Sequence, residues 1–261
     1  MNRAERRAQA RGKGVILPPA PSKVLTLGYC YSGVFGVAGL WHQSVLKLLA
    51  AGSRAGLAFR EMPAETGPFL SRSRNHILER HLQYGDDYLL FTDTDTVFSP
   101  EDVGLLLEAD AAIAGALYFA AAPDGKPPWA TALVEDGDMD PDGGGESVSP
   151  VYVPIVLPEL PVAPLREENH TDEQYTAAVQ DFMVELARPE FQPQKVASVG
   201  MGLTLIKREV CEAMAMTFEN PFEYVGDTGE DITFCHRAAS IGFDTILVPQ
   251  ARIGHIKQVI I

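Results

Sequence analysis

Apolar segments of strand length alternate with segments of helical periodicity through the first half of the chain, and this order restricts the folds open to it. We expect strands over residues 23–29, 57–61, 86–93 and 111–119. Apolar residues at helical spacing predict helices between them, over about 33–51, 72–84 and 99–109. This order favours an α/β domain with a mostly parallel sheet, in which ligands bind at the carboxyl ends of the strands.

The segment SPEDVGLLLEA carries the clearest signal for the start of a helix. Ser99 is a residue type favoured at the N-cap, and Pro100 follows at the first helical position. Glu101 and Asp102 place negative charge in the first turn, where the helix dipole favours it. We therefore expect the helix to begin directly after Ser99.

The middle of the chain interrupts the alternation. Residues 122–170 are rich in Pro, Gly, Asp and Glu, and a helix is expected over about 171–187. We expect residues 122–195 to form an insertion or lid over the sheet, and not a second core.

The α/β pattern resumes after this insertion. A strand is expected within residues 196–210, followed by a helix over about 230–241 and a strand over 244–248. Residues 23–256 are therefore predicted to form one domain. The remaining residues are expected to form a basic, Pro-rich tail and a short C-terminal tail, at 1–22 and 257–261.

The charge balance disfavours some classes of function. The 261 residues include 35 Asp and Glu against 21 Lys and Arg, a formal net charge of −14, and five of the basic residues fall within the first 14 positions. So acidic a body disfavours general nucleic-acid binding, which needs a basic face. No apolar run is long enough to span a membrane. Three cysteines without a CxxC pair predict reduced thiols and a cytoplasmic protein: Cys30, Cys211 and Cys235.

Two carboxylates follow a strongly apolar strand. Asp93 and Asp95, in FTDTDTVF, stand at its end, and the alternation of an extended chain would put them on the same side. A hard divalent cation with oxygen ligands relieves their mutual repulsion and can bind a diphosphate at its remaining positions. A polar loop that caps the strand end is the alternative.

Glu230, Asp231 and His255 are the other candidates for chemistry. Glu230 and Asp231 begin an expected helix, where a carboxylate held near an acceptor hydroxyl can serve as a general base. Acidic residues at a helix N-terminus are also favourable through the dipole alone. His255, in ARIGHIK, has the chemistry of a third ligand for Mn²⁺, and the alternative is an ordinary core or surface histidine.

The order of these pieces resembles that of the GT-A glycosyltransferases, in particular the small family-2-like enzymes of bacteria and their phages. A strand with DTD, the segment VGMGLTLIKREV, GED at a helix start and a late GH follow one another along the chain. The resemblance covers most of residues 23–256, apart from the insertion at 122–195. It implies a Rossmann-like, mostly parallel sheet flanked by helices, and a protein of the bacterial cytoplasm.

The resemblance also implies roles for individual residues. Asp93 and Asp95 would bind Mn²⁺ or Mg²⁺ and the donor diphosphate, and His255 would complete the metal shell. Asp231 would be the base if the enzyme inverts, with Glu230 beside it contacting a sugar, whereas a retaining enzyme needs no such base. Small residues let a backbone approach a ligand closely, so two glycines would shape the sugar pocket: Gly200 and Gly202.

The first half of the chain supplies candidates for the nucleotide. Tyr29 and Tyr31 lie at the end of the first expected strand, where base and ribose bind in this fold, and each either stacks on a base or packs as an ordinary aromatic. Arg74 and Asn75, in SRSRNHIL, match an Arg–Asn element that related enzymes have near the nucleotide. Arginine suits diphosphate oxygens. A solvated helix cap is the alternative for this pair.

These observations predict a metal-dependent glycosyltransferase that moves a sugar from a nucleotide-diphosphate sugar, with UDP expected as the nucleotide, to an acceptor hydroxyl. Protein, glycan, lipid carrier and modified DNA remain open as acceptors. One alternative is a sugar-phosphate nucleotidyltransferase, which should carry a basic, Gly-rich loop after the first strand, whereas SGVFGVAG has no Lys or Arg. The other alternative is a non-catalytic module that binds a sugar or a nucleotide.

Overall fold

A computed structural model gives the fold for the larger part of the chain. It describes residues 23–33, 36–66, 69–117, 119–120, 129–130, 132–136, 151–154, 171–186, 188, 191–226 and 228–256. The two expected tails and most of the expected insertion, including nearly all of residues 121–170, lie outside the described residues.

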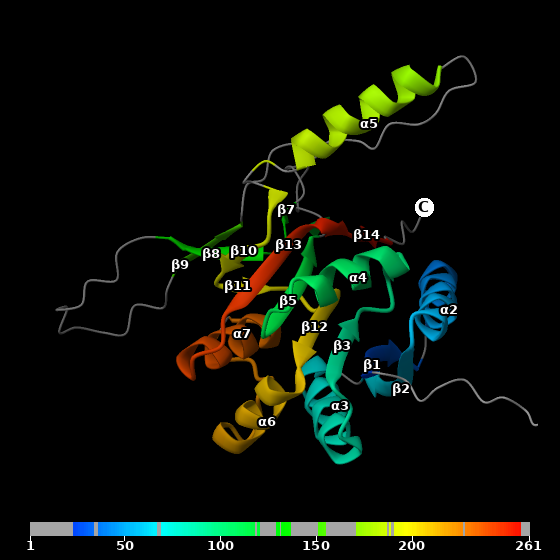
Figure 1. Ribbon diagram of the computed structural model, residues 1–261. Coiled ribbons are helices and arrows are strands. Elements are labelled where there is room, and N and C mark those ends of the chain that lie inside the picture. The colour runs from blue at the N-terminus through cyan, green and yellow to red at the C-terminus, as the bar shows by residue number, and fades with distance from the viewer. Residues whose placement is uncertain are drawn as a thin grey trace, which may run out of the picture.

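A seven-stranded sheet forms the centre of the molecule (Figure 1). Its strands, in spatial order, are β10 (Gln194–Val196), β13 (Thr245–Arg252), β5 (Ile113–Leu117), β12 (Leu203–Lys207), β3 (Tyr88–Thr92), β1 (Lys23–Ser32) and β2 (Leu57–Thr66). Five of them run parallel, while β12 and β10 run antiparallel to their neighbours. The prediction of a mostly parallel sheet is confirmed, with an antiparallel strand at its centre.

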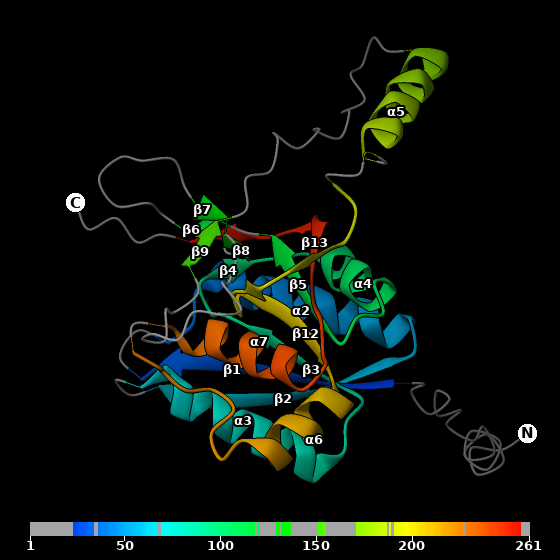
Figure 2. The ribbon, with the colours of Figure 1, turned by 90° about the vertical axis from the view of Figure 1, so that its left-hand side faces the viewer.

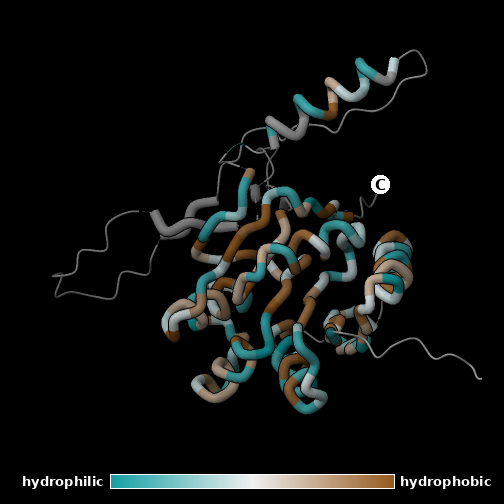
Figure 3. The backbone as a smooth tube through the Cα atoms, viewed as in Figure 1, coloured by the Kyte–Doolittle hydropathy of each residue, from teal (hydrophilic) through white to brown (hydrophobic). Residues whose placement is uncertain are grey.

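Helices cover both faces of this sheet (Figure 2). α2 (Gly39–Arg54) and α4 (Pro100–Glu108) pack on one face. α3 (Leu70–Tyr84), α6 (Arg208–Thr217) and α7 (Glu230–Ser240) pack on the other. The result is a three-layer α/β domain, and apolar residues recur along its strands (Figure 3).

Strand β3 shows how the sequence builds the two layers of core. All five of its residues are buried. Leu89 and Phe91 face the layer with α3, whereas Leu90 faces the layer with α2, because successive side chains of a strand point to opposite faces. Gly28 on the neighbouring strand lets α3 approach, since a Cβ there would lie 2.7 Å from Cγ2 of Ile77. The sheet thereby holds the N-terminal turns of α3 close to the end of β3.

The predicted start of α4 is confirmed. Ser99 is its N-cap and Pro100 its first residue. The Ser99 hydroxyl accepts a hydrogen bond from the Asp102 amide at 3.3 Å, and the Asp102 carboxylate accepts one from the Ser99 amide at 2.7 Å. This reciprocal capping box satisfies two amides at the helix end.

The first helix begins later than the sequence predicts. α2 starts at Gly39 and not near residue 33. The Gly36 amide donates to the carbonyl of Ser32 at 2.7 Å, and Gly36 has a φ of +65°. That left-handed conformation belongs to a turn, which glycine adopts without strain, so a helix cannot continue through it.

The described part of residues 122–195 adds small elements outside the main sheet. β8 (Ala132–Asp136) pairs with β9 (Val151–Pro154) and with β11 (Ser198–Val199), and β6 (Phe119–Ala120) pairs with β7 (Trp129–Ala130). The predicted helix is present as α5 (Asp172–Leu186), which stands away from the sheet in both ribbon views. The lid function of this segment stays a prediction. No helix in the described ranges has the length and apolar character needed to cross a membrane.

Candidate active site

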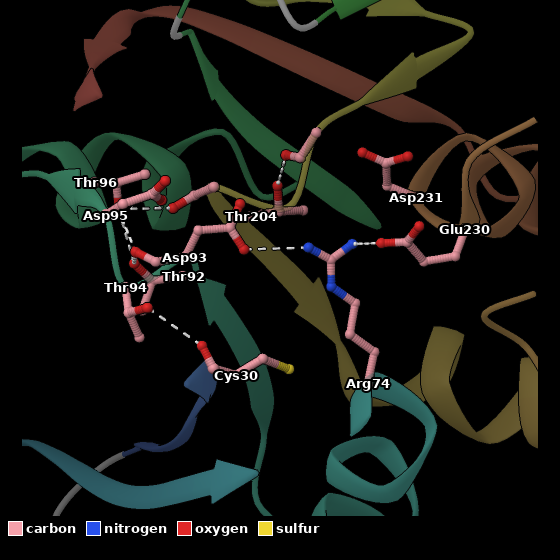
Figure 4. A network of polar contacts seen from close by, with 12 residues as sticks. Cys30, Arg74, Thr92, Asp93, Thr94, Asp95, Thr96, Thr204, Glu230 and Asp231 are labelled. Atoms are coloured by element: carbon pink, nitrogen blue, oxygen red, sulfur yellow. Dashed lines mark hydrogen bonds and ion pairs between the residues drawn. The ribbon is translucent and has the colours of Figure 1, made fainter. Parts of the chain in front are cut away.

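The two aspartates of the DTD motif lie on a turn and not on an extended chain. The Thr96 amide donates to the carbonyl of Asp93 at 3.2 Å, and the Thr96 hydroxyl donates to the same carbonyl at 2.8 Å. The chain therefore reverses at residues 94–95, and the alternation that predicted both carboxylates on one side does not apply. As a result, the side chains of Asp93 and Asp95 make different contacts (Figure 4).

Neighbouring strands fix this turn in place. The Asp93 amide donates to the carbonyl of Gly202 at 3.2 Å, and the Thr94 hydroxyl donates to the carbonyl of Cys30 at 3.3 Å. The predicted Gly200–Gly202 segment therefore lies directly beside the DTD turn, and both glycines are buried. The Gly200 carbonyl accepts a hydrogen bond from Thr204 at 2.8 Å, which holds the segment against β12.

Asp95 lies next to His255, which is 160 residues away in sequence. β4 (Thr96–Val97) pairs antiparallel with β14 (Gly254–His255), and the Ile256 amide donates to the carbonyl of Asp95 at 2.6 Å. His255 Nε2 then lies 3.0 Å from Asp95 Oδ2. The structure therefore brings together two of the three residues predicted to bind the metal.

Asp93 instead contacts Arg74, which also contacts Glu230. Arg74 Nη2 lies 3.1 Å from Asp93 Oδ1, and Arg74 Nη1 lies 2.6 Å from Glu230 Oε1. The Arg74 and Glu230 side chains are almost fully buried. Burial lowers the pKa of the Arg74 guanidinium, but the nearby carboxylates outweigh it and hold that pKa above the usual range. Arg74 is therefore a fixed cation between the end of β3 and the start of α7.

Glu230 and Asp231 occupy different environments although they are neighbours at the start of α7. Glu230 is 5% exposed and bound to Arg74, whereas Asp231 points away from Arg74 in Figure 4. The carboxylate of Asp231 accepts a hydrogen bond from the Ile232 amide at 2.8 Å. Desolvation raises the pKa of Asp231, with Arg74 opposing and Glu230 adding to the shift. The Asp93 carboxyl shows the same pattern, since desolvation raises its pKa against the pull of Arg74.

Tyr224 belongs to this site although the sequence analysis did not select it. Its hydroxyl is hydrogen-bonded to Glu230, and its side chain is half exposed. Burial of the hydroxyl, together with that hydrogen bond, raises the pKa of Tyr224 to about 12. Its nearness to the GED motif was the only available signal.

The residues predicted to bind the nucleotide have different surroundings. The Tyr29 ring packs against Trp41 with centroids 4.6 Å apart, which corresponds to the packed-aromatic alternative. Tyr31 lies two residues further along β1, on the same face and partly exposed. The Asn75 amide donates to the carbonyl of Phe222 at 2.7 Å and accepts from its amide at 2.9 Å. Asn75 therefore anchors the segment before α7 and does not extend toward the carboxylates.

The predicted metal ligands are only partly assembled. Within the described ranges, no three His, Cys, Asp or Glu side chains are grouped as a metal site requires. The carboxylate of Asp93 is ion-paired with Arg74, so Asp93 does not join Asp95 and His255 as the third ligand of the expected metal site. Asp95 and His255 nevertheless present an exposed carboxylate oxygen and an imidazole nitrogen at one place, a donor pair that suits Mn²⁺. The residues present fit a cation that takes its remaining ligands from a diphosphate and water.

Comparisons with known proteins show which solved structures have a similar fold. No family model and no curated protein matches the sequence. Among solved structures, GalNAc-T7 with UDP, GalNAc and Mn²⁺ is similar with a TM-score of 0.50 at 12% identity, over 91% of this chain and 44% of that one. A197 from STIV also matches, with a TM-score of 0.45 at 12% identity, over 90% and 96% of the two chains.

A nucleoside-diphosphate-sugar pyrophosphorylase from Vibrio cholerae RC9 matches with a TM-score of 0.34 at 9% identity, over 88% of this chain and 75% of that one. At such identities a structural likeness concerns the fold alone. The chain is therefore an α/β protein whose largely parallel, helix-flanked sheet is similar to that of GalNAc-T7.

Proposed function

We propose that the chain is a metal-dependent glycosyltransferase that uses a nucleotide-diphosphate sugar, with a UDP-sugar as the expected donor. One observation carries this proposal. Three elements far apart in sequence meet at the carboxyl end of β3, and they bring Asp95 with His255 and Asp93 with Arg74 and Glu230. The likeness of the sheet to that of GalNAc-T7 supports the same class of enzyme at the level of the fold.

Asp95 and His255 are the residues that would hold the cation. Their donor atoms are 3.0 Å apart, one on the DTD turn and the other on the adjoining β14, and both side chains are partly exposed. When bound, Mn²⁺ or Mg²⁺ supplies Lewis-acid stabilisation of the negative charge on the leaving diphosphate. Asp93, held by Arg74, keeps the turn in position.

Arg74 and Glu230 would orient the site. Glu230 is buried and bound to the guanidinium, so its carboxylate keeps Arg74 in place. Arg74 thereby places a permanent positive charge beneath the DTD turn.

Asp231 is the general base in this proposal. The acceptor hydroxyl gives its proton to the Asp231 carboxylate while its oxygen bonds to the anomeric carbon of the donor. The bond from that carbon to the diphosphate oxygen breaks, and the electron pair leaves with the diphosphate. A pKa raised by desolvation suits this task, because a stronger base accepts a proton more readily. This step belongs to an inverting enzyme.

Release of nucleotide from a panel of UDP-, GDP- and dTDP-sugars tests the proposal. We expect Mn²⁺-dependent release of a nucleoside diphosphate, lost in Asp95→Ala and in His255→Ala. Release of pyrophosphate from a nucleoside triphosphate and a sugar phosphate would instead identify a nucleotidyltransferase. Binding of a nucleotide sugar without any turnover would identify a binding module.

A further inference from the structure

A groove runs along α3, with the end of β2 on one side and the segment that joins α6 to α7 on the other. Two adjoining cavities, of about 470 and 600 Å³, share Phe69, Arg72 and His76. The first extends to Glu65 at the end of β2, and the second extends to Phe222. We call this combined space the α3 groove.

The walls of the α3 groove are held by contacts to the core. On one side, the Ser73 hydroxyl donates to the carbonyl of Glu65 at 3.1 Å and joins α3 to β2. On the other side, Asn75 holds both the amide and the carbonyl of Phe222, whose ring stacks on Phe234 at 4.3 Å. A groove with walls fixed in this way is preformed, and a ligand need not order it.

The same segment connects the groove to the catalytic carboxylates. Glu223 lines the groove and is ion-paired with Arg237, and the next residue, Tyr224, is hydrogen-bonded to Glu230. Tyr224 and Glu230 are six positions apart in sequence, and Asp231 follows directly. The segment that lines the groove therefore continues, through Tyr224, to the start of α7, where the proposed base lies.

The groove presents an exposed aromatic ring, planar polar groups and no excess of positive charge among its described lining residues. Phe69 is 65% exposed, an unusual position for a phenylalanine. Arg72 and His76 present planar hydrogen-bonding groups beside it. Arg72, Glu65 and Glu79 all line the groove, while Glu223 is paired with Arg237.

We propose that the α3 groove binds a neutral oligosaccharide and that this glycan is the acceptor, an inference that rests on the proposed function. An exposed aromatic face packs on the apolar face of a sugar ring, and planar polar groups bond its hydroxyls. A nucleic acid would need a basic groove, and this one has no excess of positive charge among the described residues. The glycan's terminal hydroxyl then supplies the proton that Asp231 accepts.

An array of neutral oligosaccharides, from disaccharides to hexasaccharides of glucose, galactose, mannose and xylose, tests this inference. The full chain is applied with Mn²⁺ and UDP, and each bound glycan is then titrated by calorimetry. We expect Phe69→Ala and His76→Ala to weaken binding of the same glycan by about tenfold each, as loss of an aromatic or hydrogen-bonding contact does. Tyr84→Ala is the control, because Tyr84 is an exposed aromatic at the opposite end of α3.

The outcomes separate this inference from the proposed function. Glycan binding that weakens in Phe69→Ala but not in Tyr84→Ala supports the groove, even if no donor is turned over. No glycan binding, or equal binding by wild type and Phe69→Ala, overturns it, while Mn²⁺-dependent donor turnover would still support the glycosyltransferase. Transfer to a peptide or to DNA in preference to every glycan also overturns it.

Discussion

The guanidinium of Arg74 joins the two halves of the candidate site. It contacts Asp93 on the DTD turn and Glu230 at the start of α7. Burying the charges of Arg74 and Glu230 is costly unless each is paired, and here both nitrogens of the fork have a carboxylate. The arrangement leaves Asp231 as the carboxylate with a raised pKa and no bond to Arg74 (Figure 4).

Asp231→Asn tests the assignment of the base. We expect the rate of sugar transfer to fall by about 100- to 10,000-fold, since the variant keeps the shape but cannot accept a proton. Donor affinity should stay nearly constant, because the base acts in the transition state. In the wild type, transfer should decline as the pH falls, with a midpoint above the ordinary aspartate pKa of about 3.9, because burial raises the pKa of Asp231.

Glu230→Gln is the matched comparison for this prediction. This variant removes a charge from the same helix turn. Because Asp231, and not Glu230, accepts the proton in the proposed mechanism, the effect should be on protein stability and donor positioning. If Asp231→Asn keeps near-full transfer while Glu230→Gln loses it, the two roles must be exchanged.

A second buried network lies at the opposite ends of the strands. The Thr26 hydroxyl donates to Asp86 at 2.7 Å and lies 2.8 Å from Nδ1 of His81. Because that hydroxyl has a single hydrogen, His81 Nδ1 carries the proton and donates to Thr26. His81 Nε2 has no hydrogen-bond partner among the described residues. A protonated His81 would bury an unpaired N–H, and desolvation accordingly lowers its pKa to about 4.

This network predicts that stability falls in mild acid. The folded pKa of His81 lies below the unfolded value of 6.5, so the unfolded chain binds the proton more tightly. The contribution is fully present above pH 6.5 and is lost as the pH falls toward 4, by about 3 kcal/mol. Urea unfolding at several pH values should show a shallower decline in His81→Gln than in the wild type. The exposed His42→Gln is the control, and equal slopes in all three proteins would contradict the prediction.

At the scale of elements, Asp102 joins α4 to the strand that leads to His255. Its carboxylate accepts hydrogen bonds from the amide and hydroxyl of Ser99, at 2.7 and 2.8 Å, and from the amide of Arg252 at 2.9 Å. The pairing of β13 with β5 shifts register between Val248 and Arg252, so this contact holds an irregular stretch of strand.

Asp102→Ala should therefore affect both stability and the site. It leaves three donors without a partner, and we expect a loss of about 2–4 kcal/mol in the free energy of unfolding by urea. Binding of Mn²⁺ should also weaken, because β14 follows this stretch of β13. Glu101→Ala is the control, since Glu101 is exposed in the same helix turn. A change of similar size in both variants would show that only surface charge matters.

The elements also show which features can be predicted from a sequence. Local patterns predicted six of the seven strands of the main sheet and the capped start of α4, because these depend on neighbouring residues. The direction of β12 and the contact of Arg74 with Glu230 depend on residues far apart in sequence. The prediction that the side chains of Asp93 and Asp95 lie on the same side was wrong. It assumed an extended chain, whereas the chain forms a turn there.

At the scale of the whole molecule, negative charge opposes the binding of the proposed donor. The chain carries a formal net charge of −14, and its candidate site gathers several carboxylates. A nucleotide diphosphate is itself an anion, so it would be repelled without added positive charge. Arg74 is already engaged by two carboxylates, and in the proposed function a divalent cation at Asp95 and His255 supplies the added charge.

Calorimetric titration of UDP, with GDP in parallel, tests this central claim most directly. We expect one nucleotide to bind in the presence of Mn²⁺ and to lose most of its affinity in EDTA. Asp95→Ala and His255→Ala should each weaken Mn²⁺-dependent binding by about 100-fold or more, since residues that merely orient a metal ligand already contribute 10- to 100-fold. Asp231→Asn should bind like the wild type. Equal affinity with Mn²⁺ and with EDTA, or unchanged binding in Asp95→Ala, would contradict the account.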